Sequence, residues 1–523
     1  MRSSPISNSS ANKVAILAFF FSLIFCGFGF LQAAMVNGEL CYALDDSFIM
    51  MAISKNIAFH HVWGLTQYHF SSTASSPLFT CILAGFIFIF GNHIALPLII
   101  NVLALLGLFV WLGQKARAWG MNRWQIWMLL MGLHFFMPIP VLLFGSMEHV
   151  LHAWIALICL QQIGENRAKL GHFHLFFMGA LLSGIRYEGL FQGGLLVLWL
   201  WKNKDWSKGL TLSLGLSFPV LWLGFYSISK GWYFLPNSII LKGYALNIEE
   251  TKSILGYLAS LAEKLIRDPH NLAVLLILGL IRLWGGKKQS LNSSYLDLVF
   301  WMCVSHFIFG RYNSVFRYEA YLIGLSWVFI WKYFCLELSI HNFSYFRNFI
   351  KNEPQMAILT LLLLYSIGLR SVKSFAAGTR AMVNIYEQQV QAALFVKKFY
   401  NSVCIGAVDV GAIAYFSECK LLDIWGLGSI EIARLRLKHR HHLYQMHRVF
   451  EKNKMQIAIV YGKGYNYPKW HKSGSWIIKN NTVCDNDTID FLSVSPFESQ
   501  PLISNLKSFE PLLPKTVSAI YYP

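Results

Sequence analysis

The chain has 523 residues and a formal net charge of +18; 55% of its residues are hydrophobic and 13% are charged. A soluble globular domain carries about 25% charged residues, so this composition excludes an ordinary soluble enzyme. The basic residues are scattered between apolar segments, which argues against a nucleic-acid partner. The positive charge fits two roles that do not exclude each other, namely cytoplasmic loops of a membrane protein and a site for an anionic lipid phosphate.

Apolar runs recur from Val14 to about Leu369. This is the pattern of a polytopic helical bundle, because a helix satisfies its own backbone hydrogen bonds in lipid. The first run, Val14–Met35, is longer than a signal peptide and has no clear cleavage motif after it, so we expect a retained first span. In chain order we expect about eleven spans, at residues 14–37, 93–113, 124–144, 149–163, 172–185, 189–202, 208–229, 270–284, 295–310, 320–336 and 354–370.

Residues 77–91, "PLFTCILAGFIFIFG", are apolar enough for a further span. Loops rich in lysine and arginine orient a membrane protein, because they stay in the cytoplasm. A span at 77–91 would move every later basic loop to the outside. We therefore expect this segment to form a membrane-surface or re-entrant helix on the outer side, with the N-terminus inside and the C-terminus outside.

The character of the chain changes after about residue 370. Residues 371–523 are more polar, and "SVCIGAVDVGAIAYFSECKLLDIWGLG" predicts a strand, a turn, a helix and a second strand. We therefore expect a mainly α fold in two parts. A transmembrane module would span residues 1–370, with its first outer loop at 38–92, and a small extracytoplasmic α/β domain would span 371–523.

Two adjacent acids, Asp45 and Asp46, follow the first span in "CYALDDSFIMMAISKNIAFHHVWG". Neighbouring carboxylates repel each other and add nothing to apolar packing, so a functional role is favoured over a structural one. A carboxylate in such a place can act as a general base that takes a proton from a hydroxyl group.

The expected topology brings polar residues from four further segments to the same outer face. They are Glu148 and His149, Arg186 and Glu188, Asn237 and Lys242, and His306, Arg311 and Arg317. One interpretation is structural, in which the acids and arginines pair with each other at the interface and the histidines lie at helix ends. The functional interpretation is that arginine forks and a lysine hold a phosphate leaving group.

The motifs that the sequence lacks indicate which kind of activated group donor the protein would use. The sequence has no P-loop, no Rossmann fingerprint and no metal-ligand spacing. An activated donor with a phosphate leaving group would then be a lipid phosphate that arrives through the bilayer, rather than a soluble nucleotide. A requirement for a divalent cation stays open at this point.

Seven segments, in chain order, carry a resemblance to a known superfamily. They are "LDDSFIMMAISKNIAFHHVWG", "SSTASSPLFTCILA", "GSMEHVL", "IRYEGL", "GWYFLPNSIILK", "FRYEAYL" and "DVGAIAYFSECKLLDIWGLGS". In the same order they resemble motifs of the GT-C superfamily of polytopic glycosyltransferases that use polyprenyl-phosphate sugars. The bacterial arabinofuranosyltransferase-like branch is the most similar. Ser146 is an insertion relative to that pattern, and Tyr187 replaces a proline.

This resemblance implies a GT-C fold and an inverting transfer of a sugar, arabinofuranose or another pentose or hexose, from polyprenyl phosphate. The acceptor would be a hydroxyl of a cell-envelope glycan, a glycolipid or a protein, and membrane lipids would surround the bundle. It implies the inner (cytoplasmic) membrane, with the active site and the C-terminal domain facing the periplasm.

The resemblance also implies roles for the residues that match the motifs. Asp45 would be the general base, with Asp46 as its close rival. The sugar and the acceptor would be bound by Glu148, His149, Arg186, Glu188, Asn237 and His306, and the lipid phosphate by Lys242, Arg311 and Arg317.

A transporter or flippase of lipid-linked saccharides is an alternative that would use the same polar face. The sequence shows no inverted repeat and no paired broken helices, which argues against it. A structural or assembly protein, with the C-terminal domain as its interaction module, is a third interpretation.

Overall fold

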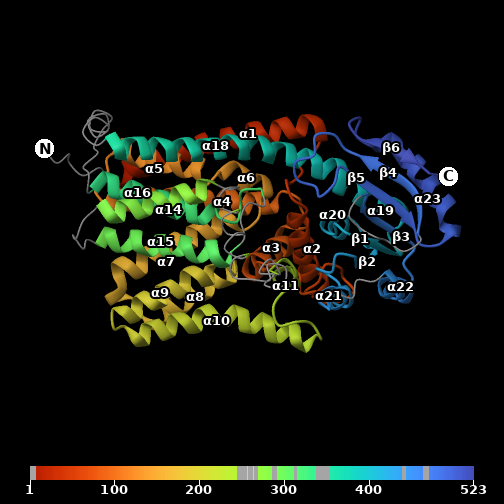
Figure 1. The fold of residues 1–523 in the computed structure, drawn as a ribbon, viewed down its shortest axis with the longest axis horizontal. Helices are drawn as coiled ribbons and strands as arrows, with labels where there is room; N and C mark the ends of the chain where they lie inside the picture. Colours follow the sequence, from red (N-terminus) through yellow and green to blue (C-terminus); the bar gives the residue numbers. More distant parts are fainter. Residues whose placement is uncertain are drawn as a thin grey trace.

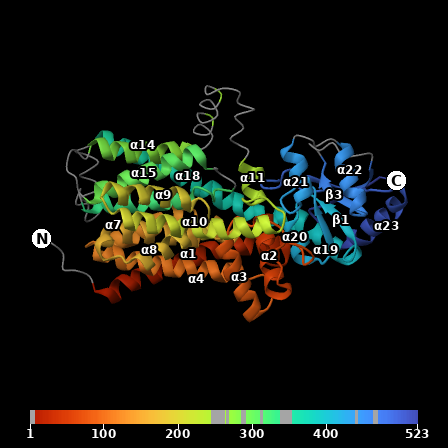
Figure 2. The same ribbon diagram turned by 90° about the horizontal axis from the view of Figure 1, so that it is seen from below.

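The computed structural model describes residues 7–243, 256, 263, 269–284, 291–310, 315–336, 354–438, 443–462 and 470–522. A bundle of helices lies along the long axis, with a small sheet at one end and the N-terminus at the other (Figures 1 and 2). The mainly α fold with a small C-terminal sheet is therefore confirmed. The bundle contains α1 (Asn8–Asn37), α4 (Leu96–Ala118), α5 (Arg123–Phe136), α6 (Ile139–Gly145), α7 (His149–Asn166), α8 (His172–Ile185), α9 (Gly189–Lys202), α10 (Trp206–Ser229), α14 (Pro269–Trp284), α15 (Leu291–Phe309), α16 (Ala320–Leu336) and α18 (Pro354–Ile385).

Three helices in the described ranges, α1, α4 and α10, are long and apolar enough to cross a membrane. Helices α5 and α6 would together make a fourth span, bent by 51°. Pro138 and Pro140 stand at that bend, where proline cannot donate a helical hydrogen bond. The other expected spans also form helices, most of them short, so a count of eleven spans is not confirmed.

Three short helices lie between the bundle and the sheet: α2 (Asp45–His60), α3 (Pro77–Phe90) and α11 (Asn237–Gly243) (Figure 1). Helix α3 occupies the segment that was expected to lie on the membrane surface. It starts at Pro77, a favoured first helical residue, ends before Gly91, and packs against α2 and α8. Helix α2 is therefore held between the bundle and the C-terminal domain.

The C-terminal domain is a six-stranded mixed sheet in the order β2-β1-β3-β5-β4-β6. Its strands are β1 (Cys404–Ala407), β2 (Lys420–Asp423), β3 (Ile457–Tyr461), β4 (His471–Ile477), β5 (Thr488–Ser493) and β6 (Ser518–Tyr521). Strand β1 pairs in parallel with β2 and β3, and the other pairs are antiparallel. The parallel unit β1, α20 (Gly411–Phe416), β2 is the strand–helix–strand that the sequence predicts.

Helix α18 carries the chain from the bundle into this domain. It runs through residue 370 without a break, continues as a π-helical turn at Tyr386–Val390, and leads into α19 (Gln391–Phe399). The remaining helices of the domain are α21 (Ile430–Leu437), α22 (Leu443–Lys452) and α23 (Ser499–Phe509). A continuous helix at this junction restricts how far the domain can move relative to the bundle.

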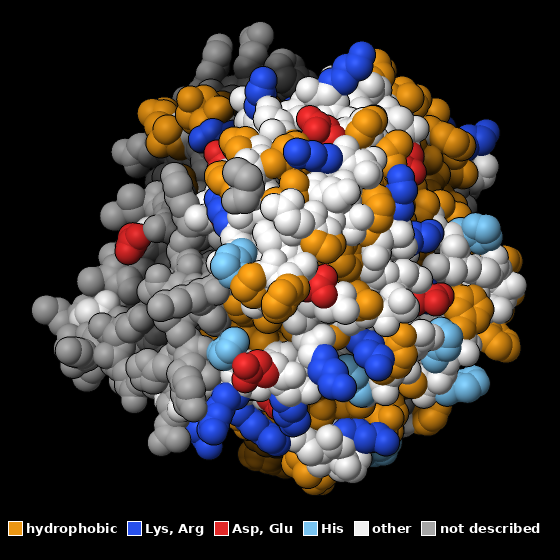
Figure 3. Space-filling view, turned by 90° about the vertical axis from the view of Figure 1, so that its right-hand side faces the viewer, with side chains coloured by type: hydrophobic (Ala, Val, Ile, Leu, Met, Phe, Trp, Pro, Cys, Tyr) orange, Lys and Arg blue, Asp and Glu red, His pale blue; other side chains and the backbone are white. Residues whose placement is uncertain are grey.

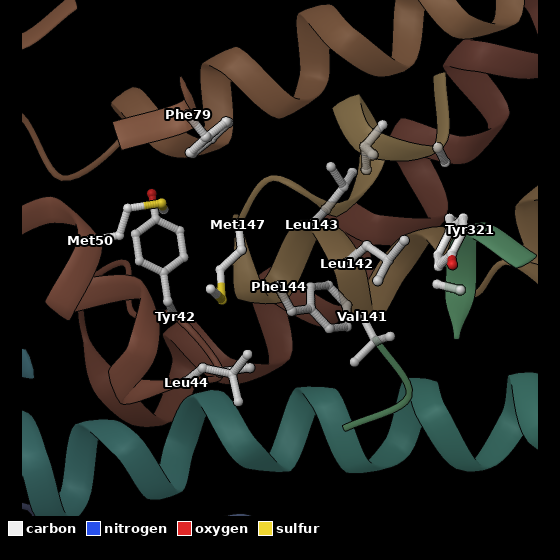
Figure 4. Packing of buried hydrophobic residues seen from close by; sticks show 14 of the residues in the cluster. Tyr42, Leu44, Met50, Phe79, Val141, Leu142, Leu143, Phe144, Met147 and Tyr321 are labelled. Carbon is white, nitrogen blue, oxygen red and sulfur yellow. The ribbon is translucent and has the colours of Figure 1, made fainter. Parts of the chain in front are cut away.

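The start of α2 is fixed to the end of α6. The backbone N–H of Ala43 donates to the carbonyl of Phe144 over 2.9 Å, and the Ser47 hydroxyl donates to the carbonyl of Gly145 over 2.5 Å. Apolar side chains fill the space around these bonds, among them Tyr42, Leu44, Met147 and Phe144 (Figure 4). The two segments that carry Asp46 and Glu148 are thereby held next to each other.

Helix α2 also docks the C-terminal domain through both ends of α20. The Asp45 carboxylate accepts the backbone N–H groups of Gly411 and Ala412 over 2.7 and 2.8 Å. At the other end, the Lys55 ammonium donates to the carbonyl of Tyr415 over 2.8 Å. A negative group at a helix N-terminus and a positive group at its C-terminus both favour the helix dipole. A Cβ at position 411 would clash with the carbonyl oxygen of Asp45, which explains the glycine there.

This contact yields a test of the docking. Replacing Asp45 with alanine removes two charge-assisted hydrogen bonds, so we expect the domain contact to lose about 1 to 2 kcal/mol. Hydrogen exchange at the amides of Gly411 and Ala412 should become faster. Asp46→Ala is the matched control, and it should leave that exchange unchanged; equal effects of both substitutions would contradict the assignment.

Candidate functional site

A cavity of about 330 Å³ opens beside α2, where α9, α10, α11 and α15 meet the loops that join the helices. Five of the predicted residues line it: Asp46, Glu148, Arg186, Glu188 and Arg317. They come from four separate segments of the sequence. The structure therefore brings these predicted side chains to one place.

The cavity wall has a polar part and an apolar part. The charged side chains lie on α2 and on the loops before α7, α9 and α16, whereas Phe191 of α9, Val220 of α10 and Phe309 of α15 form an apolar wall. Phe309 is 60% exposed, so part of this apolar surface is open. Such a wall fits a ligand with a charged head and an apolar tail.

Asp46 and Arg317 form one ion pair of the cavity. The Arg317 Nη2 lies 2.5 Å from Asp46 Oδ2, and the arginine side chain is nearly buried. The Tyr318 ring lies 5.0 Å from this guanidinium group and 5.4 Å from that of Arg186. One aromatic ring therefore contacts both cations and keeps them in a fixed arrangement.

Arg186 bridges two glutamates. Its Nη1 pairs with Glu148, and its Nε and Nη2 donate to Glu188 over 3.0 and 2.6 Å. Burial by itself raises the pKa of a carboxyl group, but Arg186 outweighs it and lowers the pKa of Glu188 to about 2. For Glu148, burial outweighs the shared arginine and raises its pKa. The pKa values of the two carboxyl groups are thus shifted in opposite directions.

Among the residues that the structure describes, two buried polar atoms in the cavity wall have no hydrogen-bond partner. They are Oε2 of Glu148 and Oγ of Ser238. Leaving a buried polar atom unpaired costs about 1 to 3 kcal/mol, so native proteins seldom do so without a reason. A ligand hydroxyl in the cavity would supply the missing bonds.

A row of hydroxyl groups on the cavity wall was missed by the residue predictions. Thr73, Ser75, Ser76 and Thr80 all line it. They come from the stretch "SSTASSPLFT", in which six of the ten residues carry a hydroxyl. This density of hydroxyl groups is the sequence feature that indicates a polar wall. The hydroxyls of Ser76 and Thr80 also donate to backbone carbonyls.

Asp45 does not line the cavity. Both of its oxygens accept hydrogen bonds from α20. Burial and the charge of Asp409 raise the pKa of Asp45, whereas the N–H groups of Ala412 and Gly411 lower it; the net shift is upward. Asp409 itself accepts hydrogen bonds from Gln389 and Tyr461. The expected adjacent pair is therefore split between two surroundings.

Three further predicted residues, Asn237, His149 and His306, do not line the cavity. The Asn237 amide donates to the carbonyl of Gly426 over 2.9 Å and so joins α11 to the C-terminal domain. The His149 ring lies 3.4 Å from Nη1 of Arg186, and the His306 ring lies 3.3 Å from the Tyr321 hydroxyl. Lys242 belongs to the end of α11, but its side chain, like the whole of Arg311, lies outside the described residues.

One residue of the cavity wall, Leu427, comes from the C-terminal domain and is positioned by a turn around Asp423. Asp423, at the end of β2, accepts the backbone N–H groups of Trp425, Gly426 and Gly428 over 2.7, 2.8 and 2.6 Å. This turn places Leu427 on the cavity wall. Burial raises the pKa of Asp423 to about 6, although these N–H groups by themselves lower it. The domain thus closes one side of the cavity.

Over the residues that the structure describes, no group of three or more His, Cys, Asp or Glu side chains is arranged to hold a metal ion. The fold and cavity define a helical protein with several helices long and apolar enough to span a membrane, and with a polar site at the end that bears its sheet domain. A family model described as a domain of unknown function (DUF8728) matches residues 383–493. No curated protein and no solved structure matches the chain.

The two glutamates beside Arg186 give a paired test. The folded-state pKa of Glu188 lies below its usual value, so its ion pair stabilises the fold above about pH 4.5 and this contribution is lost as the pH falls through about 2. Glu188→Gln should therefore cost about 2 to 3 kcal/mol at pH 7 and less at pH 3. Thermal unfolding across this pH range measures the difference.

Glu148→Gln is the matched control, because burial shifts the pKa of Glu148 upward, which reduces what its charge contributes to stability. Its effect on thermal stability should be the smaller of the two. Equal losses for both variants, or a loss in Glu188→Gln that does not depend on pH, would contradict the opposite pKa shifts.

Proposed function

We propose that the protein is an integral-membrane glycosyltransferase of the GT-C type. It transfers a sugar, arabinofuranose or another pentose or hexose, from a polyprenyl-phosphate donor to a hydroxyl of a cell-envelope glycan, glycolipid or protein. It resides in the inner membrane of a bacterial cell, with about eleven spans, and its site and C-terminal domain face the periplasm. The observation that carries this proposal is the cavity in which two arginines, three carboxyl groups and an apolar wall meet.

The apolar wall supports a lipid-linked donor. A polyprenyl chain can lie against Phe191, Val220 and Phe309, while its phosphate reaches the polar part of the cavity. Arg317 is well suited to the phosphate, because a guanidinium group has five N–H donors and can contact a phosphate while it keeps its bond to Asp46. The resemblance of the motifs around Asp46, Glu148, Arg186 and Arg317 points to the same donor class.

Asp46 is the general base in this proposal, since it is the member of the aspartate pair that faces the cavity. The acceptor hydroxyl oxygen attacks the anomeric carbon and forms the new C–O bond. The bond from that carbon to the phosphate oxygen breaks, and the phosphate leaves with the electron pair. The proton of the acceptor hydroxyl goes to Asp46, and the configuration at the anomeric carbon is inverted.

The remaining polar groups would bind the sugar. Glu148 and Ser238 each offer an unpaired oxygen, and the hydroxyl row at Thr73 and Ser75 lies on the same wall. A sugar ring carries several hydroxyl groups that can donate and accept at once, which matches a wall of this kind. A transporter of lipid-linked saccharides could use the same cavity, but it would need no base.

The test is a comparison of the two aspartates. Asp46→Asn should lower sugar transfer at least about 100-fold, because a general base contributes about 10² to 10⁴. Asp45→Asn should retain more transfer than Asp46→Asn, because it weakens domain docking and leaves the base in place. Purified protein in nanodiscs, given synthetic polyprenyl-phosphate arabinofuranose and a polyprenyl-phosphate hexose with candidate acceptors, allows products to be measured by mass spectrometry.

Binding of polyprenyl phosphate is the control for both variants, and it should change little. Full transfer by Asp46→Asn would contradict the assigned base. Translocation of a lipid-linked saccharide by the wild-type protein, without transfer, would favour the transporter instead.

A further inference from the structure

A second cleft of about 530 Å³ lies on the other side of the turn that carries Leu427. It is bounded by the first outer loop at Tyr68, by the end of α10 at Lys230 and Trp232, and by the C-terminal domain at Lys420 and Ser429. Because Leu427 lines the first cavity and Gly428 lines the second, the same short turn separates the two. A chain-like ligand in the cleft would therefore end close to the cavity.

The cleft is positively charged. Three lysines line it, namely Lys230, Lys420 and Lys452, against a single glutamate among its described lining residues. That glutamate, Glu431, is already paired with Lys452 at 2.5 Å. Within the described part of the chain, Lys230 and Lys420 form no ion pair and both are exposed. Two ammonium groups are thus available to an anionic ligand.

Aromatic rings lie next to these ammonium groups. Tyr68 is 48% exposed, and the Lys420 Nζ lies 5.8 Å from its ring centre. Trp232 is held by an edge-to-face contact with Phe70, with ring centroids 5.8 Å apart. Aromatic faces in a polar cleft bind the apolar C–H faces of flat, hydroxyl-rich ligands such as sugar rings.

The cleft belongs to the domain junction rather than to a loose loop. The Tyr68 hydroxyl donates to the carbonyl of Glu418 over 2.9 Å, and Arg434 donates to the carbonyl of Gly231 over 2.7 Å. Both ends of the cleft are therefore tied across the junction. On the end of the molecule that carries the C-terminal domain, lysine and arginine side chains form separate groups among apolar and other side chains (Figure 3).

We propose that this cleft binds an anionic saccharide, carboxylated or phosphorylated, and that this saccharide is the acceptor chain. The role as acceptor rests on the proposed glycosyl transfer; the binding does not. Lys230 and Lys420 hold the negative groups, Tyr68 and Trp232 hold sugar rings, and the end of the chain passes the Leu427 turn into the cavity.

The test measures binding by the full-length protein in nanodiscs made of neutral lipid. The probes are fluorescent trigalacturonic acid, a phosphorylated maltotriose and neutral maltotriose. We expect the two anionic probes to bind more tightly than the neutral one, with an affinity that falls as salt rises. Whether the carboxylated or the phosphorylated probe binds more tightly identifies the source of the charge.

Lys420→Gln and Lys230→Gln should each weaken the binding of the anionic probe by about five- to tenfold. Lys507→Gln is the matched control, because Lys507 is also exposed and lies 5.6 Å from the ring of Tyr521, in a part of the domain outside the cleft. Equal affinities for neutral and anionic probes, no binding of either anionic probe, or equal effects of Lys420→Gln and Lys507→Gln would each overturn the proposal. So would binding of anionic lipid vesicles alone.

The two proposals fail separately. Asp46→Asn should bind the anionic probe as the wild type does. Saccharide binding without sugar transfer by the wild-type protein would overturn the proposed function but would support the proposed saccharide binding by the cleft. Transfer that is unchanged in Lys420→Gln, with unchanged binding, would overturn the cleft and leave the function standing.

Discussion

Two neighbouring carboxyl groups on the first turn of α2 have separate roles. Asp45 binds the C-terminal domain, and Asp46 lines the cavity. Successive side chains of an α-helix point about 100° apart, so Asp45 and Asp46 cannot face the same surroundings. Asp45 takes two backbone N–H groups of α20, and Asp46 faces the cavity with Arg317. If α2 rotated, the domain contact and the cavity charge would change together. The position of Asp46, the proposed base, is thereby coupled to the docking of the C-terminal domain.

Charge inside the cavity is balanced by pairs rather than by solvent. Arg317 pairs with Asp46, and Arg186 pairs with both Glu188 and Glu148, although burial raises the pKa of Glu148. Buried ions need such pairing because the loss of water around a charge is costly. The phosphate of the proposed donor would add negative charge next to two guanidinium groups that are already in place, so little rearrangement would be required. This is the arrangement expected of a site that stabilises a developing phosphate charge.

The sequence predicted the helices well because long apolar runs are local signals. Every segment expected to span the membrane is helical in the structure, with the break at Pro138 and Pro140 as the main departure. Helix α18 extends to Ile385, past the apolar run, because its later turns pack against the domain and lie outside the hydropathy signal.

The sequence indicated which charged residues lie together, because charge in apolar surroundings is a local signal, but it did not indicate how their side chains are oriented. Arg186 and Glu188 stood out as charges in apolar surroundings, and they do line the cavity. The different directions of Asp45 and Asp46, and the structural bond of Asn237 to Gly426, depend on contacts with residues far along the chain. No local pattern contains that information.

In the proposed mechanism, the cavity beside Asp46 binds the phosphate and the first apolar units of a polyprenyl phosphate. Photo-crosslinking with a polyprenyl-phosphate analogue that carries a diazirine near its phosphate tests this directly. The account predicts labelling of peptides that contain Phe191, Val220 and Phe309, and loss of that labelling when unlabelled polyprenyl phosphate competes. Labelling confined to other helices, or labelling that no competitor reduces, would contradict it.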